Sequence, residues 1–286
     1  DFNLGYDCGD ATCFGVSNPV SRIVGLPVIT GQPTDQITCS AQAVSFGVTV
    51  TGSTISYQWQ YSATTNGTFS DVSGATAANL TINPATSANA GAYRVVVSNT
   101  TGSVTSNVVT LVVNSAPVVT SQPANQAGCV GGSAVFTVGY TSSLPSTIQW
   151  QVFNDLSATY ENIPGETSST LTLSNITTAQ SGTYQAQLTN SCGVTNSNPA
   201  TLTVNSTPVV NTSPANQAGC VGSSVSFTAN ANSALGHTTQ WQVSSNGGAV
   251  FTSIAGETTG TLTLTNIQVG QSGNQYRAVF ANSCGS

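Results

Sequence analysis

Short stretches in which apolar and polar residues alternate recur along the whole chain and predict β-strands. Val44-Ser45-Phe46 is one of them, and Ala134-Val135-Phe136 and Val225-Ser226-Phe227 stand at similar places further on. A period of two puts every second side chain on the same face of a strand, as expected where one face of a sheet is buried. Segments rich in glycine, asparagine and serine separate these stretches and are typical of turns. The pattern predicts an all-β protein.

A repeat of about 91 residues orders these strands. The tripeptide Gln-Trp-Gln is centred on Trp59, Trp150 and Trp241, the three tryptophans of the chain, which are 91 residues apart both times. A phenylalanine precedes each tryptophan by 13 or 14 residues, and a leucine follows it by 21. Self-similarity at a fixed period is typical of repeated structural units. It predicts an extension at 1–25 and domains at 26–114, 115–205 and 206–286, with last strands at 106–113 and 197–204 in the first two.

The order of these residues resembles the immunoglobulin-like domains that form tandem arrays in bacterial cell-surface and extracellular proteins. Phe…Trp…Leu-x-Leu…Gly-x-Tyr runs through residues 26–286, with Ile82 as the second leucine of the first repeat and one extra residue before Tyr276. The resemblance implies β-sandwiches with the tryptophan in the core and the tyrosine at the start of strand F. The residues expected to join the two sheets of each domain are Phe46, Trp59 and Tyr93, then Phe136, Trp150 and Tyr184, then Phe227, Trp241 and Tyr276.

Only four residues link one repeat to the next, as in Asn114-Ser115-Ala116-Pro117. Links this short do not act as flexible tethers, so we expect the three sandwiches to be arranged as a rod. The third repeat ends at Ser286 without a counterpart of the last strand, so the third sandwich is expected to lack it.

Seven cysteines without a zinc-like pair favour disulfides and an extracellular setting. In the immunoglobulin-like topology, the turn before strand B of one domain comes next to the turn between strands F and G of the following domain. This predicts the interdomain bridges Cys39–Cys192 and Cys129–Cys284. Bridges within a domain, Cys129–Cys192 and Cys220–Cys284, are the alternative, although they would have to span roughly 40 Å of extended strand. Cys8, Cys13 and Cys220 stay unassigned.

A copy of the missing strand stands at the opposite end of the chain. Residues 17–25 match 197–205 in type at most positions, so residues 14–25 are a candidate donor strand that would complete domain 3 of a neighbouring chain. Its expected contact residues are Val16, Val20, Ile23 and Val24. Arg22 falls where a leucine should face the core, unless the register shifts by one residue. The alternative is that residues 1–286 are a window cut from a longer array.

The composition excludes several classes of function. Charged residues make up 4% of the chain, lysine is absent, and the arginines are Arg22, Arg94 and Arg277. Nucleic-acid binding and electrostatic membrane binding need basic side chains and are not expected. No apolar run approaches the length of a membrane span. A start at Asp1 without a signal peptide is expected of an exported and processed chain.

Candidate chemistry is sparse, and no enzyme activity, cofactor or metal is expected. His237 has no counterpart in the other repeats, and Glu166 and Glu257 are equivalent positions of different domains. Asp7-Cys8-Gly9-Asp10 lacks the regular spacing of a calcium loop, and the tryptophans are expected in cores rather than in a sugar site. Six sequons permit glycan decoration.

Two classes of function remain for the chain. The first is a structural subunit of an extracellular filament that polymerises head to tail with itself by strand donation. The second is a stalk or adhesin segment of a longer cell-surface protein, with glycans or a surface as the partner.

Overall fold

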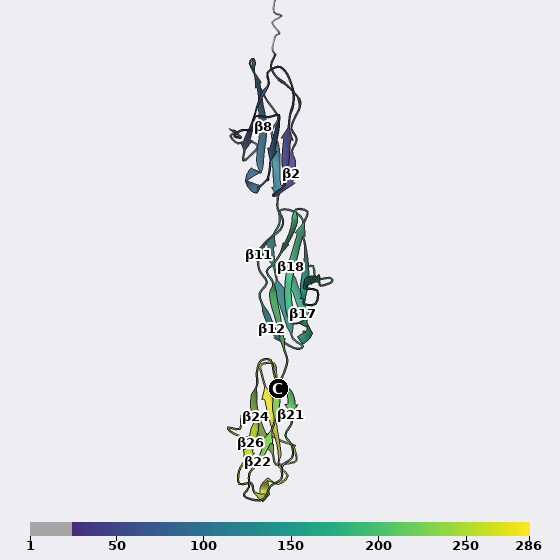
Figure 1. The fold of residues 1–286 in the computed structure, drawn as a ribbon, viewed down its shortest axis with the longest axis vertical. Coiled ribbons are helices and arrows are strands. Elements are labelled where there is room, and N and C mark those ends of the chain that lie inside the picture. The colour runs from purple at the N-terminus through teal and green to yellow at the C-terminus, as the bar shows by residue number, and fades with distance from the viewer. Residues whose placement is uncertain (1–24) are drawn as a thin grey trace, which may run out of the picture. The chain divides into compact units, whose positions relative to one another are not determined.

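The computed structural model describes residues 25–286. The regular structure in this part of the chain consists of β-strands and three short 3₁₀ turns, so the fold is all-β. The chain divides into two units, residues 1–114 and 115–286, and each is described by itself. The first unit holds one β-sandwich (domain 1) and the second holds two (domains 2 and 3), coloured from purple to yellow along the chain (Figure 1). The prediction of three tandem immunoglobulin-like sandwiches is confirmed. Cys8, Cys13 and residues 14–24 of the candidate donor strand lie outside the described residues.

Domain 1 has one large sheet and one small one. The large sheet has the order β2-β10-β8-β5-β6, with β9 paired to β8, and the separate two-stranded pairs β1-β4 and β3-β7 are together called the small sheet. The strands are β1 (Val28–Gly31), β2 (Gln36–Cys39), β3 (Val44–Gly47), β4 (Thr49–Thr51), β5 (Ser56–Ser62), β6 (Ser70–Asp71), β7 (Asn79–Ile82), β8 (Gly91–Asn99), β9 (Gly102–Thr105) and β10 (Val109–Asn114).

Domain 2 repeats this topology strand for strand. Its large sheet has the order β12-β20-β18-β15-β16 with β19 on β18, and its small sheet consists of β11-β14 and β13-β17. The strands are β11 (Val118–Ser121), β12 (Gln126–Cys129), β13 (Ser133–Thr137), β14 (Gly139–Thr141), β15 (Thr147–Asn154), β16 (Thr159–Asn162), β17 (Thr170–Ser174), β18 (Gly182–Asn190), β19 (Gly193–Asn196) and β20 (Ala200–Asn205).

Domain 3 has a smaller set of strands, of which β27 is the last in residues 206–286. The pairs β21-β23 and β22-β26 and the sheet β25-β24-β27 form it. The strands are β21 (Val209–Thr212), β22 (Val225–Thr228), β23 (Asn230–Asn232), β24 (Thr238–Ser244), β25 (Thr252–Ser253), β26 (Thr261–Leu264) and β27 (Gln275–Ala281). One short 3₁₀ turn precedes strand F of each domain: η1 (Ser87–Asn89), η2 (Thr178–Gln180) and η3 (Val269–Gln271).

The first strand of each complete domain changes sheets at a proline. In domain 2, β11 pairs with β14 of the small sheet, whereas β12 pairs in parallel with β20 of the large one. Pro123 stands between β11 and β12. Proline has no N–H to donate to a strand ladder, and this favours a break at that point.

The last strand of the complete domains, expected at 106–113 and 197–204, is present as β10 and β20 and begins three residues later than expected. A first piece, β9 or β19, precedes it, with an irregular stretch between the two pieces. At this break a serine side chain, instead of a backbone carbonyl, accepts the hydrogen bond from strand F. Ser106 Oγ accepts from Val95 N at 3.0 Å, and Ser197 Oγ accepts from Ala186 N at 2.9 Å.

Each core centres on its tryptophan. Trp59, Trp150 and Trp241 have no exposed surface. In domain 2, the ring of Phe136 lies 6.2 Å from that of Trp150 and stacks on Tyr184 at 5.2 Å. The same trio recurs in the other two domains. These rings bridge the two sheets where antibody-type domains place a disulfide.

Candidate functional site

The repeated Gln-Trp-Gln tripeptide is explained by hydrogen bonds inside each domain. In domain 2, Trp150 Nε1 donates to Ser168 O at 2.9 Å, and Gln149 Nε2 donates to Ile163 O at 2.8 Å. On the other side of the tryptophan, Gln151 Oε1 accepts from Gln185 Nε2 at 2.8 Å. The equivalent bonds of the tryptophan and the first glutamine occur in domains 1 and 3. The tripeptide therefore ties β15 to β18 and to the segment between β16 and β17.

The tyrosine at the start of strand F anchors the preceding turn. Tyr93 Oη donates to Asn89 O at 2.8 Å, and Tyr184 Oη donates to Gln180 O at 2.7 Å. Burial, with Tyr61 as a lesser cause, raises the pKa of Tyr93 to about 12, and burial also raises the pKa of Tyr184. Both hydroxyls therefore stay protonated donors at neutral pH.

The raised pKa of Tyr93 predicts a loss of stability in alkali. An unfolded tyrosine releases its proton near pH 10, so the unfolded state loses the proton first as pH rises from about 10 to about 12. Stability contributed by the protonated hydroxyl is complete below this window and falls across it, by on the order of 2 kcal/mol. Urea unfolding followed by Trp59 fluorescence, with the other two tryptophans replaced by phenylalanine, measures the fall. Tyr93→Phe should remove it, and an equal fall in this variant would contradict the assignment.

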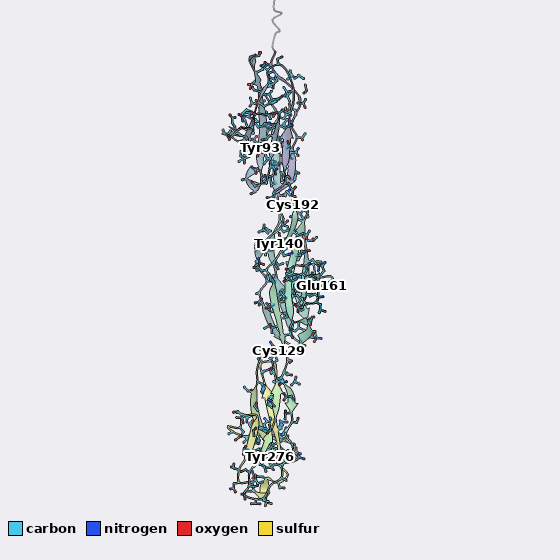
Figure 2. All side chains as sticks on the ribbon, viewed as in Figure 1. Tyr93, Cys129, Tyr140, Glu161, Cys192 and Tyr276 are labelled. Carbon is cyan, nitrogen blue, oxygen red and sulfur yellow. A yellow bond between two sulfur atoms is a disulfide. The ribbon has the colours of Figure 1, made fainter. Side chains whose placement is uncertain are left out.

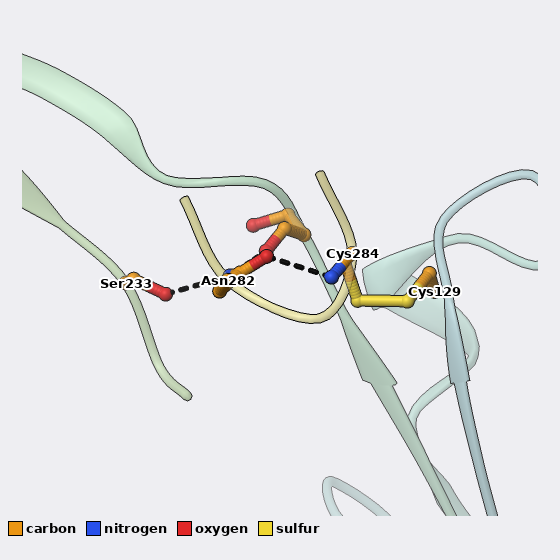
Figure 3. The surroundings of a disulfide bond; sticks show 5 residues. Cys129, Ser233, Asn282 and Cys284 are labelled. Carbon is orange, nitrogen blue, oxygen red and sulfur yellow. Dashed lines mark hydrogen bonds between the residues drawn. A yellow bond between two sulfur atoms is a disulfide. The ribbon is translucent and has the colours of Figure 1, made fainter. Parts of the chain in front are cut away.

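An asparagine at the end of strand F braces the segment that enters each domain. Asn282 Nδ2 donates to Ser206 O at 2.8 Å and to Ser233 Oγ at 2.9 Å, while its Oδ1 accepts from Cys284 N at 2.8 Å (Figure 3). Asn190 makes the same three kinds of contact in domain 2. In domain 1, Asn99 Nδ2 donates to Gly25 O at 2.7 Å. The sequence showed these asparagines only as strand ends, although the recurrence of Asn-x-Cys-Gly at Asn190 and Asn282, with Thr101 in place of the cysteine after Asn99, was a usable signal.

The glycine after this turn lets the entering segment pack closely. A Cβ atom at Gly193 would lie 3.4 Å from Ala116 Cβ, one at Gly285 would lie 3.0 Å from Thr207 Cγ2, and one at Gly102 would lie 2.8 Å from Leu26 Cδ2. Leu26, Ala116 and Thr207 therefore hold equivalent positions. The residues just before them, Gly25, Ser115 and Ser206, are equivalent as well.

The disulfide Cys129–Cys284 joins domains 2 and 3, with its Cα atoms 5.5 Å apart (Figure 3). This is the interdomain bridge expected from the topology, and its presence excludes the alternative pairs Cys129–Cys192 and Cys220–Cys284. Cys129 is the last residue of β12, and Cys284 lies in the turn after β27. Cys39–Cys192 would connect the two units and stays a prediction. Cys220, the counterpart of Cys129, is a free and exposed thiol.

Domain 3 has an open groove where the complete domains have their last strand. The groove has a volume of about 430 Å³, and its apolar lining includes Val225, Phe227, Leu264, Ile267 and Tyr276 (Figure 2 labels Tyr276). Phe227 and Tyr276 are only half-buried, whereas their counterparts in domains 1 and 2 are buried. Both rings still pack against the core of domain 3, but no strand of the described residues covers them.

The same comparison shows what covers the core elsewhere. In domain 2, β20 lies between β12 and β18, and Leu202 on it is only 2% exposed. Residues 217–220 of domain 3, which correspond to β12, are not in a strand. In domain 2, β20 pairs with one edge of β18. The corresponding edge of β27 in domain 3 is unpaired among residues 206–286.

The candidate chemical residues lie apart. The ring of His237 meets that of Phe280 edge-on at 5.1 Å. Glu166 and Glu257 contribute backbone oxygens that accept from the tryptophan N–H of their own domains, and Ala75 does the same in domain 1. A carboxylate is therefore not required at this position. Within residues 25–286, no group of three or more His, Cys, Asp or Glu residues is placed to hold a metal ion. No helix in the same part of the chain is long and apolar enough to cross a membrane.

Comparison with known proteins places the chain among repeated immunoglobulin-like modules. A fragment of titin with three immunoglobulin domains superposes with a TM-score of 0.60 at 16% identity, over 90% of this chain and 94% of the fragment. The eight N-terminal immunoglobulin domains of Down syndrome cell adhesion molecule superpose with a TM-score of 0.55 at 18% identity, over 92% of this chain and 35% of theirs. Identities this low show the fold alone.

Sequence comparison finds a closer kind of relative. Endoglucanase C of Cellulomonas fimi is 34% identical over 180 residues, which are 62% of this chain and 16% of that protein. The family described as "Domain of unknown function (DUF8696)" matches three times, at residues 29–115, 118–206 and 209–286. With three consecutive copies covering most of its length, the chain belongs to the DUF8696 family.

Proposed function

We propose that this chain is a non-catalytic spacer segment of a larger extracellular protein, in which immunoglobulin-like domains form a stiff rod. The observation that carries the proposal is the Cys129–Cys284 disulfide. It adds a second covalent connection at a boundary that the chain already crosses once, through Ser206, Thr207 and Pro208. Two connections side by side resist bending and twisting better than one.

Three further observations support a spacer of an extracellular protein. The similar stretch of Endoglucanase C is a small part of a longer protein, so repeats of this kind occur as modules beside other domains. Disulfides persist mainly in oxidising compartments, which favours an extracellular setting. A surface of hydroxyl and amide groups with 4% charged residues offers few groups for electrostatic ligand binding.

NMR relaxation of the full chain tests the spacer proposal. We expect the amides of domains 2 and 3 to report one shared rotational correlation time. In the variant Cys129→Ser/Cys284→Ser, the two domains should report different, shorter times, while Cys220→Ser should behave as the native chain. Independent tumbling of domains 2 and 3 in the native chain would refute the proposal.

The open groove of domain 3 favours a second candidate, a filament built by strand donation from residues 14–25 of a neighbouring chain. Sedimentation and electron microscopy of the chain with residues 1–25 deleted test it. Loss of assembly on deletion would support donation, and unchanged assembly would refute it. Binding of glycans or of a surface stays a prediction of the sequence.

The register of the candidate donor strand, that is, which of its residues corresponds to which position of the last strand, makes the filament the weaker of the two candidate functions. Asn99 binds Gly25 O as Asn190 binds Ser115 O, so Gly25 corresponds to Ser115. Counting back by sequence, Ser21 corresponds to Leu111. This register relieves the difficulty with Arg22, but it places a serine where the complete domains bury a leucine.

A further inference from the structure

Cys220 lies at one end of the open groove of domain 3. Its neighbours in the chain, Gly219 and Val221, both line the groove. Cys220 occupies the same place in domain 3 that Cys129 occupies in domain 2, seven residues before the strand B phenylalanine. Cys129 is bonded to the following domain, and Cys220 is free. Domain 3 thus has an unfilled strand position and an unused bridging cysteine at one site.

Domain 2 shows how these two features are connected when both are used. β20 pairs in parallel with β12, and its last residue, Asn205, lies opposite Cys129. The chain then runs through Ser206 to Pro208 into domain 3, whose turn cysteine, Cys284, reaches back to Cys129. A strand in the groove of domain 3 would therefore end beside Cys220 and deliver the domain that follows it to that thiol.

We propose that the groove and Cys220 form one acceptor site for a further domain of the same family. The strand that precedes this domain fills the groove, with a leucine at the position of Leu202. The cysteine in the turn after its strand F, in an Asn-x-Cys-Gly sequence like that around Cys284, forms a disulfide with Cys220. The inference rests on the proposed spacer function, because it extends the same junction to a further domain.

Formation of the disulfide at the acceptor site requires a two-electron oxidation of the two thiols. Each of the two thiols loses a proton and an electron as the sulfur–sulfur bond forms. A small-molecule disulfide such as oxidised glutathione takes up both electrons and both protons and leaves as two thiols. The product is a disulfide of the same kind as Cys129–Cys284.

A second copy of this chain is a poor occupant of the site. Domain 1 carries Thr101 at the position of Cys192 and Cys284, so it has no sulfur there for Cys220. The segment before domain 1 also has Ser21 at the leucine position in the register that the Asn99–Gly25 bond supports. The occupant that fits both features is a domain with a turn cysteine, like domain 3, preceded by a strand with a leucine at the position of Leu202, like β20.

Two extended chains provide a matched test. The first adds a copy of residues 195–286 after Ser286, which supplies a strand, a linker and a domain with the turn cysteine. The second adds a copy of residues 14–114, which supplies a linker and a domain with Thr101 in place of the cysteine, preceded by a segment with Ser21 in place of the leucine. Both are refolded in a glutathione redox buffer. A third chain repeats the first with Leu202→Asp in the copied strand.

We expect peptide mapping of the first chain to find Cys220 joined to the copied Cys284, with Cys220 no longer alkylated by a maleimide. Amide exchange at residues 217–220 should slow by about tenfold or more as a strand pairs there. In the second chain Cys220 should stay reactive, and in the third the slowing of exchange should be lost. A free Cys220 or unchanged exchange in the first chain would overturn the acceptor site. The spacer proposal fails separately, by independent tumbling of domains 2 and 3 in the native chain.

Discussion

Removal of the Cys129–Cys284 disulfide will lower the free energy of unfolding of domain 2 and of domain 3 by about 4 kcal/mol each. The loss follows from the loop that the bond closes when either domain unfolds. While domain 2 is folded, the pairing of Asn205 with Cys129 holds the start of the linker next to the disulfide, so unfolding of domain 3 leaves a closed loop of roughly 80 residues from Asn205 to Cys284. While domain 3 is folded, the bond from Asn282 Nδ2 to Ser206 O holds the linker near Cys284, so unfolding of domain 2 leaves a loop of similar length from Cys129 to Ser206.

Native-state hydrogen exchange of two matched amides measures this effect. Trp150 N donates to Glu166 O and Trp241 N donates to Glu257 O, both at 2.9 Å, so they report the stability of domains 2 and 3 at equivalent positions. In Cys129→Ser/Cys284→Ser, exchange at both amides should accelerate by about three powers of ten, which is 4 kcal/mol at about 1.4 kcal/mol for each. Cys220→Ser is the control and should change neither amide. Acceleration at only one of the two tryptophans would contradict the loop account.

Truncation of the strand B phenylalanine will cost domain 2 more than domain 3. Phe136 is fully buried against Trp150 and Tyr184, and Phe136→Ala should destabilise domain 2 by about 3–5 kcal/mol through lost burial and an unfilled cavity. Phe227 makes the same ring contacts but lines the open groove and is half-buried. Phe227→Ala should therefore cost roughly 1–2 kcal/mol less, because less apolar surface returns to water and water can enter the space left behind.

The same two tryptophan amides measure this pair of variants. The expected result is a larger acceleration of exchange at Trp150 in Phe136→Ala than at Trp241 in Phe227→Ala. Equal losses would mean that Phe227 is as well covered as Phe136, and hence that something fills the groove of domain 3 in solution. Addition of the strand in the extended chain with residues 195–286 should bring the cost of Phe227→Ala up to that of Phe136→Ala.

Much of the fold could be predicted because the pattern that specifies it is local and repeated. The alternation around Val44 and Phe46 and the period of the tryptophans were enough for strands, sandwiches and their number. The Cys129–Cys284 bond could also be predicted, because the direction of strands B and F decides which turns meet. The two-piece last strand could not be, since the break depends on a hydrogen bond from Val95 N to the Ser106 side chain across the sheet.

The repeat, the sandwich class and the residues that build each core all follow from the local pattern, because burial of apolar side chains at a period of two leaves few other ways to fold such a chain. What those residues face depends on the packing of distant segments. Phe136 and Phe227 are equivalent in sequence, yet one is enclosed by β20 and the other lines a groove. Asn282, Cys284 and Gly285 acquire their roles only when the linker passes beside them. Exposure and pairing depend on neighbours far away in the chain, which a local pattern does not contain.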